Sequence, residues 1–554
     1  MDALARQRRL IDRVARTLQL AAGRVARFET HISWVLVAGG DAYKFKKALT
    51  LPFVDCSTLA ARRFYCREEC RLNSRLAPDL YRGVVAVGGD PASPTIGAAG
   101  TPREYAVWMR AFEQDALWSV RLADGLLGGD EVDRLAALLA AFHRRAPRAP
   151  PGASWGTAAM VAATFAATMA GLESALADDG AQGAERVQAA STVLRECAAQ
   201  LFSGLPALAS ARRTQGMVRE CHGDLHCGNI LTRDGEVQAF DCIEFDPALR
   251  WIDTIDDLAF ACMDLACRGS PGLAARLLSG YLECSGDHAG LAMLRLYRMH
   301  RALVRARVML LRARQPRLSD AARAGCLAQG RSYLDFARRC AHAGPVALVA
   351  MHGFSGSGKT TVARLLVELL GAVQLRSDVE RKRLPAAAPG LGRQYGAAAT
   401  RRTYARLGTL ARTVLGAGWP AVVDAACLRA DQRTRLRRLA AALGVPFFIV
   451  DVRAGCAAML ARIAARGRQG DDASDADAAV LDMQLRSAEP LASSELAHTI
   501  VVDANTGIDR EQLRQACAPL LAALARQNAS GQPVADGFQA AHIDPAHTTT
   551  HAGP

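Results

Sequence analysis

The segment GFSGSGKT, residues 353–360, constrains the fold of this chain more than any other. It follows an apolar run at 347–351 and precedes the helix-like sequence TVARLLVELL. Glycines at positions 356 and 358 let successive backbone N–H groups turn inward at a helix N-terminus, which favours the binding of phosphate groups. The Lys359 ammonium suits the β and γ phosphates of a nucleotide, and the Thr360 hydroxyl suits a Mg²⁺ ion. The segment therefore predicts a strand, a nucleotide-binding loop and a helix. The candidate nucleotide-binding residues are Gly353, Ser355, Gly356, Ser357, Gly358, Lys359, Thr360 and Thr361.

The region around this loop, residues 344–525, alternates short β-rich runs with helical ones. Examples are VALVAMHG, TTVARLLVELL, WPAVVDA and PFFIVDV. This alternation is typical of an α/β domain with a parallel sheet and crossover helices.

Residues 1–343 have a different pattern. Strand-like runs, among them HISWVLVAGG, DAYKFKKAL and EYAVWMRAF, come first, with GG or GD pairs between them that are typical of hairpin turns, and helical patterns follow. From residue 526 the chain becomes polar and contains His542, His547 and His551; we expect a disordered tail over 526–554. The sequence thus predicts two domains, 1–343 and 344–525, and a tail.

The composition excludes several classes of protein. Half of the 554 residues are hydrophobic and 22% are charged, which is typical of packed domains. The formal net charge is +14, but basic residues are spread along the chain with acidic ones between them, so a nucleic-acid partner is not favoured. The N-terminus is charged throughout and does not resemble a signal peptide, and the uncharged stretch from Ala149 to Leu172 predicts a buried helix rather than a membrane span. Fifteen cysteines without a C-x-x-C pair suggest a reducing, cytoplasmic setting.

Further charged residues follow the phosphate loop at the predicted strand ends. Asp378 follows the second strand and is a candidate base toward an acceptor hydroxyl, and Arg381 lies one helical turn later. Asp424 ends the next strand and is a candidate for orienting Mg²⁺. Arg462 and Arg466, four residues apart, share a helix face and suit a mobile segment that brings positive charge to the transition state.

A second group of chemically active residues lies in the first region. The segment HGDLHCGNIL, residues 222–231, precedes a predicted hairpin at Asp234-Gly235 and the sequence FDCIEFD. Phosphoryl transfer asks for this order: Asp224 as the base, with Asn229 and Asp241 as ligands of Mg²⁺. His222 would brace the loop, and Glu244 is a further candidate carboxylate.

Lysine is rare in this chain, and four of its five lysines fall in the two candidate sites. Only Lys44, Lys46, Lys47, Lys359 and Lys382 occur among the 68 basic residues, the rest being arginine. Period-two alternation along a strand puts Lys44 and Lys46 on one face, so either could contact nucleotide phosphates. The glutamate partner would come from a following helix that offers Glu68 and Glu69, of which we prefer Glu69. Residues Met109 to Phe112 would form the hinge beside the adenine.

The second region resembles the small P-loop kinases, among them gluconate kinase, chloramphenicol phosphotransferase, zeta-toxin-like kinases and polynucleotide kinases. The shared features are GxxGSGKT, Asp-x-x-Arg after the second strand and Arg-x-x-x-Arg. The resemblance covers about 347–505 and implies that Asp378 is the acceptor base.

The first region resembles the aminoglycoside phosphotransferase and choline-kinase-like branch of the protein-kinase fold, which implies an α+β domain. More closely, the chain is similar to bacterial proteins that fuse such a domain to a P-loop AAA-family ATPase or small-molecule-kinase-like domain. The phrases ISWV, YKFKK, CREECRLNSRLAPDLY, HGDLHCGNIL and DCIEFD carry this resemblance over about 30–510. It favours Lys44, which directly follows a tyrosine. No G-x-G-x-x-G loop precedes Lys44.

These observations predict an ATP- and Mg²⁺-dependent cytoplasmic phosphotransferase with two sites, each acting on a small-molecule hydroxyl. A nucleotide-sensing ATPase that transfers no phosphate and a kinase of nucleic-acid ends are the alternatives. The sequence names neither acceptor and leaves the oligomeric state open.

Overall fold

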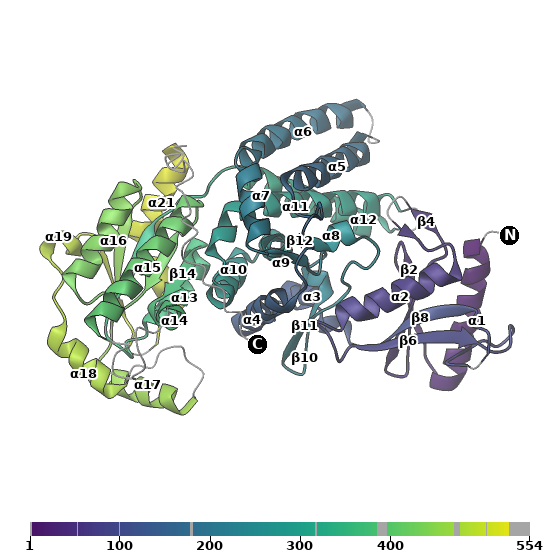
Figure 1. Ribbon diagram of the computed structural model, residues 1–554, viewed down its shortest axis with the longest axis horizontal. Helices are drawn as coiled ribbons and strands as arrows, with labels where there is room; N and C mark the ends of the chain where they lie inside the picture. Colours follow the sequence, from purple (N-terminus) through teal and green to yellow (C-terminus); the bar gives the residue numbers. More distant parts are fainter. Residues whose placement is uncertain are drawn as a thin grey trace. The chain divides into compact units, whose positions relative to one another are not determined.

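The computed structural model describes residues 3–51, 54–98, 100–177, 181–315, 318–384, 396–469, 477–505 and 507–530. The chain forms two compact units (Figure 1): Met1–Ser285 with Ala292–Ala341, and Gly286–Leu291 with His342–Pro554. The sequence did not predict that Gly286–Leu291 groups with the second unit, and we propose the domain junction after residue 343. Helix α21 (Ala518–Ser530) extends into the predicted tail, whose remainder, with His542, His547 and His551, lies outside the described residues.

The first unit begins with a six-stranded antiparallel sheet in the order β1-β2-β3-β8-β6-β7. Helix α1 (Ala3–Ala22) packs on one face through Ile11 and Val14, against Trp34 and Phe45 of the sheet. The other face, which carries Lys44 and Lys46, is covered by α2 (Leu59–Asn73). The strands are β1 (Ala26–Glu29), β2 (Ser33–Ala38), β3 (Asp41–Lys46), β6 (Tyr81–Gly88), β7 (Thr95–Ile96) and β8 (Glu104–Arg110), with a small hairpin of β4 (Thr50–Leu51) and β5 (Val54–Asp55).

Two tight turns in this unit follow the glycine pattern of the sequence. Gly39 and Gly40, with φ of 60° and 84°, join β2 to β3, and Asp234 and Gly235, with φ of 52° and 80°, join β10 (Ile230–Arg233) to β11 (Glu236–Ala239). Positive φ at both central residues suits the twist of a two-residue hairpin. Both predicted turns are therefore present.

The remainder of the first unit is mainly helical. Short strands β9 (Val218–Glu220) and β12 (Trp251–Asp253) pair with each other and flank the segment that holds the predicted catalytic loop. The other elements are η1 (Gln114–Ala116), α3 (Trp118–Ala123), α4 (Gly129–Arg145), α5 (Ala158–Ala177), α6 (Ala181–Phe202), α7 (Leu205–Thr214), η2 (Cys227–Asn229), α8 (Pro247–Arg250), α9 (Thr254–Cys267), α10 (Pro271–Ser285), α11 (Leu291–Ala313) and α12 (Asp320–Arg339); η3 (His288–Gly290) groups with the second unit.

Helix α5 corrects one expectation. The sequence predicted a buried helix from Ala149, but α5 begins at Ala158 and only 28% of its most apolar window, Ala158–Leu176, is buried. Among the described residues it is the one helix long and apolar enough, by length and composition, to cross a membrane. It lies beside α6 (Figure 1), and Glu173 of α5 pairs with Arg195 of α6. The uncharged stretch is rich in alanine, which tolerates solvent because each side chain exposes little apolar area.

The second unit contains a five-stranded, fully parallel sheet in the order β14-β15-β13-β16-β17. The central strand β13 is nearly inaccessible to solvent, because helices pack on both sheet faces. Helices α13, α20 and α21 cover one face, and α15 and α16 pack on the sheet through other strand residues. The elements are β13 (Leu348–His352), α13 (Lys359–Leu370), β14 (Val373–Arg376), α14 (Ser377–Arg383), α15 (Ala397–Gly416), β15 (Ala421–Asp424), α16 (Ala430–Ala442), β16 (Phe447–Arg453), α17 (Cys456–Gln469), α18 (Ala478–Ser487), α19 (Ser493–Leu496), β17 (Thr499–Asp503), α20 (Arg510–Ala516) and α21.

The strand order explains where the second candidate site forms. The chain leaves β13 and returns through β14 and β15 on one side, then through β16 and β17 on the other. The carboxyl end of β13 is therefore a point where the strand order reverses, and ligands bind at such points in open parallel sheets. The predicted phosphate loop follows β13 directly.

Candidate active sites

The first candidate site is built on a buried chain of alternating charges between β3, α2 and the segment after β11. Lys44 Nζ donates to Glu69 Oε1 at 2.9 Å and to Asp241 Oδ1 at 2.5 Å. Glu69 is fully buried, whereas Glu68 pairs with Arg71 near the surface. The structure therefore brings together Lys44, Glu69 and Asp241, three residues selected from the sequence. Burial lowers the pKa of Lys44, but Asp241 and Glu69 outweigh it, so the net shift is upward and the ammonium stays charged.

Lys46 extends this chain of charges in a way the sequence did not predict. Its Nζ donates to Glu69 Oε2, so that each oxygen of Glu69 accepts from a different lysine, and to Glu244 Oε1 at 2.5 Å. The Lys46 side chain is 2% exposed and that of Glu244 is 4% exposed. Burial raises the pKa of Glu244 in spite of the lysine beside it. The result is an ordered series, Asp241–Lys44–Glu69–Lys46–Glu244, that ties the loop 241–244 to the sheet.

Three oxygen-bearing side chains lie near one another at this site: Asp224 and Asn229 of the predicted catalytic loop, and Asp241, whose carboxylate feels the charge of Asp224. Asn229 Nδ2 donates to the backbone oxygen of Asp224 at 3.0 Å and to its Oδ2 at 3.1 Å, which leaves the amide oxygen of Asn229 available. The carboxylates of Asp224 and Asp241 are 34% and 42% exposed, more than their bracing partners. Amide and carboxylate oxygens are the ligands that Mg²⁺ prefers, so Asn229 and Asp241 fit a magnesium site.

The charge state of Asp224 suits a proton acceptor. Burial alone would raise its pKa, but His226, whose Nε2 lies 3.5 Å from Asp224 Oδ2, together with Arg305 and His222 outweighs burial, and the net pKa lies below the ordinary value. His222, predicted as a brace, contacts the Phe240 carbonyl oxygen through Nε2 at 2.9 Å and accepts from the Asp224 N–H at 3.2 Å through Nδ1. The loop is thus held to the strand segment that precedes Asp241.

Three buried aspartates of α9 hold the same loop, and sequence reasoning missed them. Asp257 accepts hydrogen bonds from the N–H groups of His222, at 3.0 Å, and Gly223, at 2.8 Å. Asp264 accepts from the Cys227 N–H at 2.9 Å, and Asp256 binds Arg301, which in turn donates to the Gly223 carbonyl. The signal was present in the sequence as three carboxylates within the otherwise apolar TIDDLAFACMDLAC.

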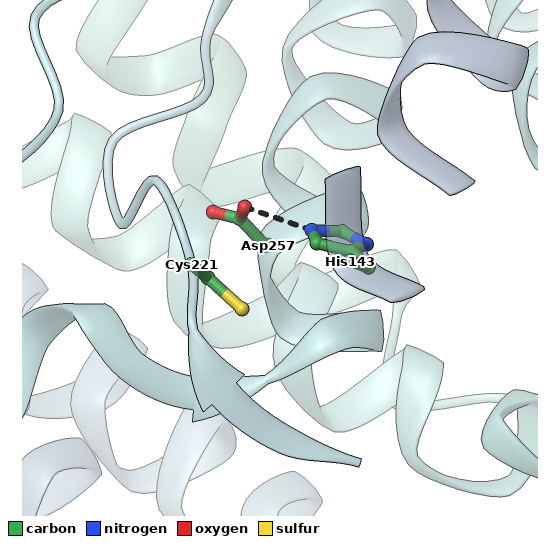
Figure 2. A group of neighbouring side chains, drawn as sticks. All are labelled: His143, Cys221 and Asp257. Atoms are coloured by element: carbon green, nitrogen blue, oxygen red, sulfur yellow. Dashed lines mark hydrogen bonds and ion pairs between the residues drawn. The ribbon is translucent and has the colours of Figure 1, made fainter. Parts of the chain in front are cut away.

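His143, Cys221 and Asp257 form a buried cluster beside this loop (Figure 2), with potential metal-ligand atoms within 4.8 Å of one another. The His143 Nε2 contacts Asp257 Oδ2 at 3.1 Å, and its Nδ1 contacts Tyr281 Oη at 2.9 Å. Burial would raise the pKa of Asp257, but His143 and His222, the latter through its charge and its backbone N–H, lower it to about 2. Because hydrogen bonds occupy both oxygens of the carboxylate, the cluster serves as a loop anchor.

The predicted hinge lies at the end of β8. Met109 is buried in the core shared by α2 and the sheet, and Phe112 packs edge-on against Phe240 with ring centroids 5.3 Å apart. Because Phe240 directly precedes Asp241, an apolar contact links the hinge to the predicted magnesium ligand.

In the second candidate site, the glycines of the phosphate loop are required by backbone geometry. Gly353, Gly356 and Gly358 have φ of 139°, 79° and 99°. A Cβ on Gly353 would lie 2.5 Å from the Val452 carbonyl oxygen, and one on Gly356 would lie 2.5 Å from that of Met459. The loop therefore packs closely on β16 and α17, and only glycine fits at these two positions.

Lys359, Thr360 and Asp424 meet at the carboxyl edge of the sheet. Burial lowers the pKa of Lys359, although Asp424 and Asp378 oppose the shift, and Lys359 Nζ donates to the Phe354 carbonyl oxygen at 2.5 Å. Asp424 is 5% exposed and accepts a hydrogen bond from Gln374 Nε2 at 2.8 Å. Burial raises the pKa of Asp424, although Lys359 and a hydrogen bond with Thr360 act to lower it. The hydroxyl and carboxylate oxygens fit a magnesium site.

The structure places the remaining predicted residues around the same opening. Arg381 Nη1 donates to Asp378 Oδ1 at 2.9 Å within α14. Arg462 of α17 donates to the carbonyl oxygens of Gly356 and Ser357 at 3.3 and 3.2 Å, and also to that of Ala504. In this structure Arg462 therefore contacts the phosphate loop, and its role in a mobile segment stays a prediction.

These residues line one cavity of about 440 Å³. Of the predicted residues, Gly353 and Ser357 do not line it, and Ser357 is buried. Arg376, Arg429 and Gln484 line it but were not predicted; Gln484 Oε1 accepts from the Ser355 N–H at 2.8 Å. Only the fold brings Gln484 to the loop, since it lies on α18, more than one hundred residues later in the chain. The predicted residues that line the cavity are Ser355, Gly356, Gly358, Lys359, Thr360, Thr361, Asp378, Arg381, Asp424, Arg462 and Arg466.

Two family models match separate parts of the chain. The model of the phosphotransferase enzyme family matches residues 105–296, which include the loop with Asp224, Asn229 and Asp241. The model of an AAA domain matches residues 348–491, which include the phosphate loop. The chain therefore carries a phosphotransferase-family domain followed by a P-loop domain, as the sequence resemblance implied.

Similarity over most of the chain extends to a mycobacterial protein. The uncharacterized protein Rv2004c of Mycobacterium tuberculosis is 32% identical over 464 residues, which cover 82% of this chain and 88% of the relative. Among solved structures, a choline/ethanolamine kinase family protein from Mesorhizobium loti is 15% identical, with 60% of this chain and 99% of that chain covered and a TM-score of 0.34. A gluconokinase from Sinorhizobium meliloti is 23% identical, with 34% and 97% covered and a TM-score of 0.24.

Proposed function

The chain belongs to one family with Rv2004c of Mycobacterium tuberculosis and joins a phosphotransferase-family domain to a P-loop kinase-like domain, and from this premise we propose that each domain transfers the γ-phosphoryl group of ATP to a small-molecule hydroxyl. We propose further that both reactions require Mg²⁺ and that the protein acts in the cytoplasm. The observation that carries the proposal is the convergence of Asp224, Asn229 and Asp241 with the Lys44–Glu69 pair.

In the first site, Lys44 would bind the α and β phosphates, and Glu69 would hold Lys44 in position from the opposite side. Asn229 and Asp241 would hold Mg²⁺, which supplies charge neutralisation on the transferring phosphoryl group. Asp224, held ionised, would accept the proton of the acceptor hydroxyl as its oxygen bonds to the γ phosphorus and the bond from that phosphorus to the bridging oxygen of ADP breaks, with ADP as the leaving group. The apolar contact between Phe112 and Phe240 supports a hinge for adenine over Met109–Phe112.

In the second site, the loop 353–360 would bind the phosphates through backbone N–H groups and Lys359. Thr360 and Asp424 would hold Mg²⁺ or its water ligands. Asp378 would accept the acceptor proton, with Arg381 fixing its carboxylate. Arg466, on the α17 face that includes Arg462, lines the cavity and would neutralise charge on the transferring group.

The test incubates the full chain with Mg²⁺, γ-labelled ATP and a metabolite extract freed of macromolecules, and follows labelled products. Asp224→Asn should remove the products of the first site and Lys359→Ala those of the second, and the double variant should form none. Glu68→Gln is the matched control, because Glu68 neighbours Glu69 in sequence but pairs with Arg71 instead.

The alternatives give different results in the same assay. A nucleotide sensor would bind a non-hydrolysable ATP analogue yet form no labelled small molecule. A nucleic-acid-end kinase would label oligonucleotide ends with a steep dependence on salt. An unchanged product pattern in the double variant would refute the proposal.

A further inference from the structure

Arg305 of α11 is a cationic side chain beside the first candidate site that the proposed function does not use. The residue is half-buried, and its Nε is buried and has no hydrogen-bond partner. Arg305 also forms no ion pair with the part of the chain that the structure describes. An arginine side chain keeps its charge inside proteins, and a buried charged donor without a partner is unfavourable. Arg305 therefore has donor groups that a ligand can satisfy.

The phase of α11 turns Arg305 toward the predicted catalytic loop. Arg301, one helical turn earlier, donates through Nη1 to the Gly223 carbonyl oxygen at 3.0 Å and pairs with Asp256. Gly223 directly precedes Asp224, the candidate base. Because residues four apart are neighbours on one helix face, the contact of Arg301 with the loop places Arg305 on the same side of α11.

The pKa values of the nearby acids indicate the same proximity. Burial would raise the pKa of Asp224, but His226 lowers it, and Arg305 is the next charge that acts in this direction. Burial would likewise raise the pKa of Asp241, but there the strongest opposing charges are those of the lysines on β3, and Arg305 is not among the leading influences. Arg305 therefore lies nearer to the candidate base than to the proposed magnesium ligand, which is the acceptor side of the site.

The acids around Arg305 already have other partners. Burial would raise the pKa of Asp264, but Arg268, His226 and Arg305 lower it to about 2. Asp264 Oδ1 accepts a hydrogen bond from Tyr333 Oη. Its Oδ2 accepts from a backbone N–H of the loop at 2.9 Å and from Arg268 Nε at 3.0 Å. Neither Asp264 nor the candidate base forms an ion pair with Arg305, so a third group can complete the hydrogen bonds of its guanidinium.

We infer that Arg305 binds an anionic group of the acceptor in the first domain, and that this acceptor is a small hydroxylated carboxylate or a phosphate or sulfate ester. The inference rests on the proposed function of that domain. A guanidinium presents its N–H groups in a planar fork that matches the oxygens of such groups. Arg305 would hold the acceptor beside Asp224 while the hydroxyl oxygen bonds to the γ phosphorus, ADP leaves and the hydroxyl proton passes to Asp224. A cation at this position also disfavours acceptors that carry positive charge near the hydroxyl.

The first test measures anion binding without knowledge of the acceptor. The full chain is saturated with Mg²⁺ and a non-hydrolysable ATP analogue, and sulfate, acetate or neutral glycerol is then titrated in calorimetry. The wild type should bind sulfate or acetate but not glycerol, and Arg305→Gln should weaken one anion-binding event by about tenfold or more. Arg307→Gln is the matched control and should bind anions as the wild type does, because Arg307 lies on another face of α11, against Gly171 of α5.

Failure of this inference and failure of the proposed function are distinguishable. A chain that does not bind the ATP analogue refutes the proposed function. A chain that binds the analogue but binds neither anion, or whose wild type and two variants bind the anions equally, overturns only the inference about Arg305.

The second test uses the labelled products of the first domain, which are those that Asp224→Asn removes from the metabolite assay. Accurate mass should identify acceptors that carry a carboxylate or a phosphate or sulfate ester. With such an acceptor, Arg305→Gln should raise the acceptor KM about tenfold or more and leave the KM of ATP within about twofold, and Arg305→Lys should restore part of the affinity.

Two outcomes of the second test would overturn the inference. One is a first-domain acceptor that is neutral or cationic. The other is an Arg305→Gln variant in which kcat and the KM of ATP change while the acceptor KM does not, since that result would assign Arg305 to the transferring phosphoryl group.

Discussion

Replacing Lys46 with methionine removes the cation that lies between two buried carboxylates, those of Glu69 and Glu244. Glu69 retains Lys44 as a partner, but Lys46 supplies the ion pair described for the side chain of Glu244. Methionine has a similar length and fills most of the vacated volume, so the substitution mainly removes charge. The principal consequence should therefore be an uncompensated carboxylate at Glu244.

The expected loss of folding free energy is about 3–5 kcal/mol at pH 7, the usual cost of removing one partner of a buried ion pair. It should depend on pH. Burial already holds the pKa of Glu244 above its ordinary value, and without Lys46 the pKa rises further. The folded variant then keeps a proton that the unfolded chain releases near pH 4.3, so the loss grows as the pH rises from there. We expect Lys46→Met to be less destabilising at pH 5 than at pH 8.

The assay is urea unfolding followed by tryptophan fluorescence. Five of the six tryptophans, all except Trp419, lie in the first unit, so the signal reports mainly the unfolding of that unit. Lys46→Met with Glu244→Leu should recover most of the stability, because an apolar pair replaces the ion pair without a stranded charge. Lys47→Met is the control and should cost about 1 kcal/mol, since Lys47 pairs with Glu29, whose side chain is 40% exposed.

Two results would refute this reasoning. One is a Lys46→Met variant within about 1 kcal/mol of the wild type at both pH values. The other is a double variant with Glu244→Leu that is as unstable as Lys46→Met alone. Either would mean that Lys46 does not neutralise the carboxylates it contacts.

Three further predictions concern other residues. Gly356→Ala should abolish binding of an ATP analogue by the second domain in calorimetry, because the added Cβ would clash with the Met459 carbonyl oxygen. Gly371→Ala should retain this binding, because Gly371 also has positive φ but has open space around it. Asp257→Asn should lower phosphoryl transfer by the first domain at least tenfold, since two N–H groups of the catalytic loop lose a charged acceptor; unchanged turnover would contradict the anchoring role. Burial lowers the pKa of His300 to about 3, below its value near 6.5 in the unfolded chain, so its contribution to stability is lost as the pH falls. Between pH 7 and 5 the wild type should lose about 2 kcal/mol of unfolding free energy through His300. The His300→Gln variant should lack this part of the pH dependence in urea titrations.

The sequence was informative where a site is local. The phosphate loop lies within eight consecutive residues, and its glycines, lysine and threonine each follow from the demands of a turn around phosphates. The series His222, Asp224, Asn229 is likewise short, and the two hairpin turns follow from positive φ at glycine and aspartate. Strand periodicity was sufficient to place Lys44 and Lys46 on one face of β3.

Prediction failed where a contact joins distant segments without a spacing rule. No local pattern shows that Lys44 and Lys46 share Glu69, or that Glu244 contacts Lys46 from nearly two hundred residues away. Gln484 reaches the phosphate loop from α18, more than one hundred residues later in the chain. The extent of burial of α5 also depends on what packs against it, which hydropathy does not report.

The sequence by itself determined the two kinds of domain, their order and most of the candidate catalytic residues, because those depend on backbone torsions and on chemistry within short segments. Only the tertiary structure decided which charges are paired and which remain open to a ligand. The energy of a charge depends on its distance from other charges and from water, and folding sets both distances. That is why the alternating charges from Asp241 to Glu244 and the buried Nε of Arg305, without a partner among the described residues, emerged only from the folded chain.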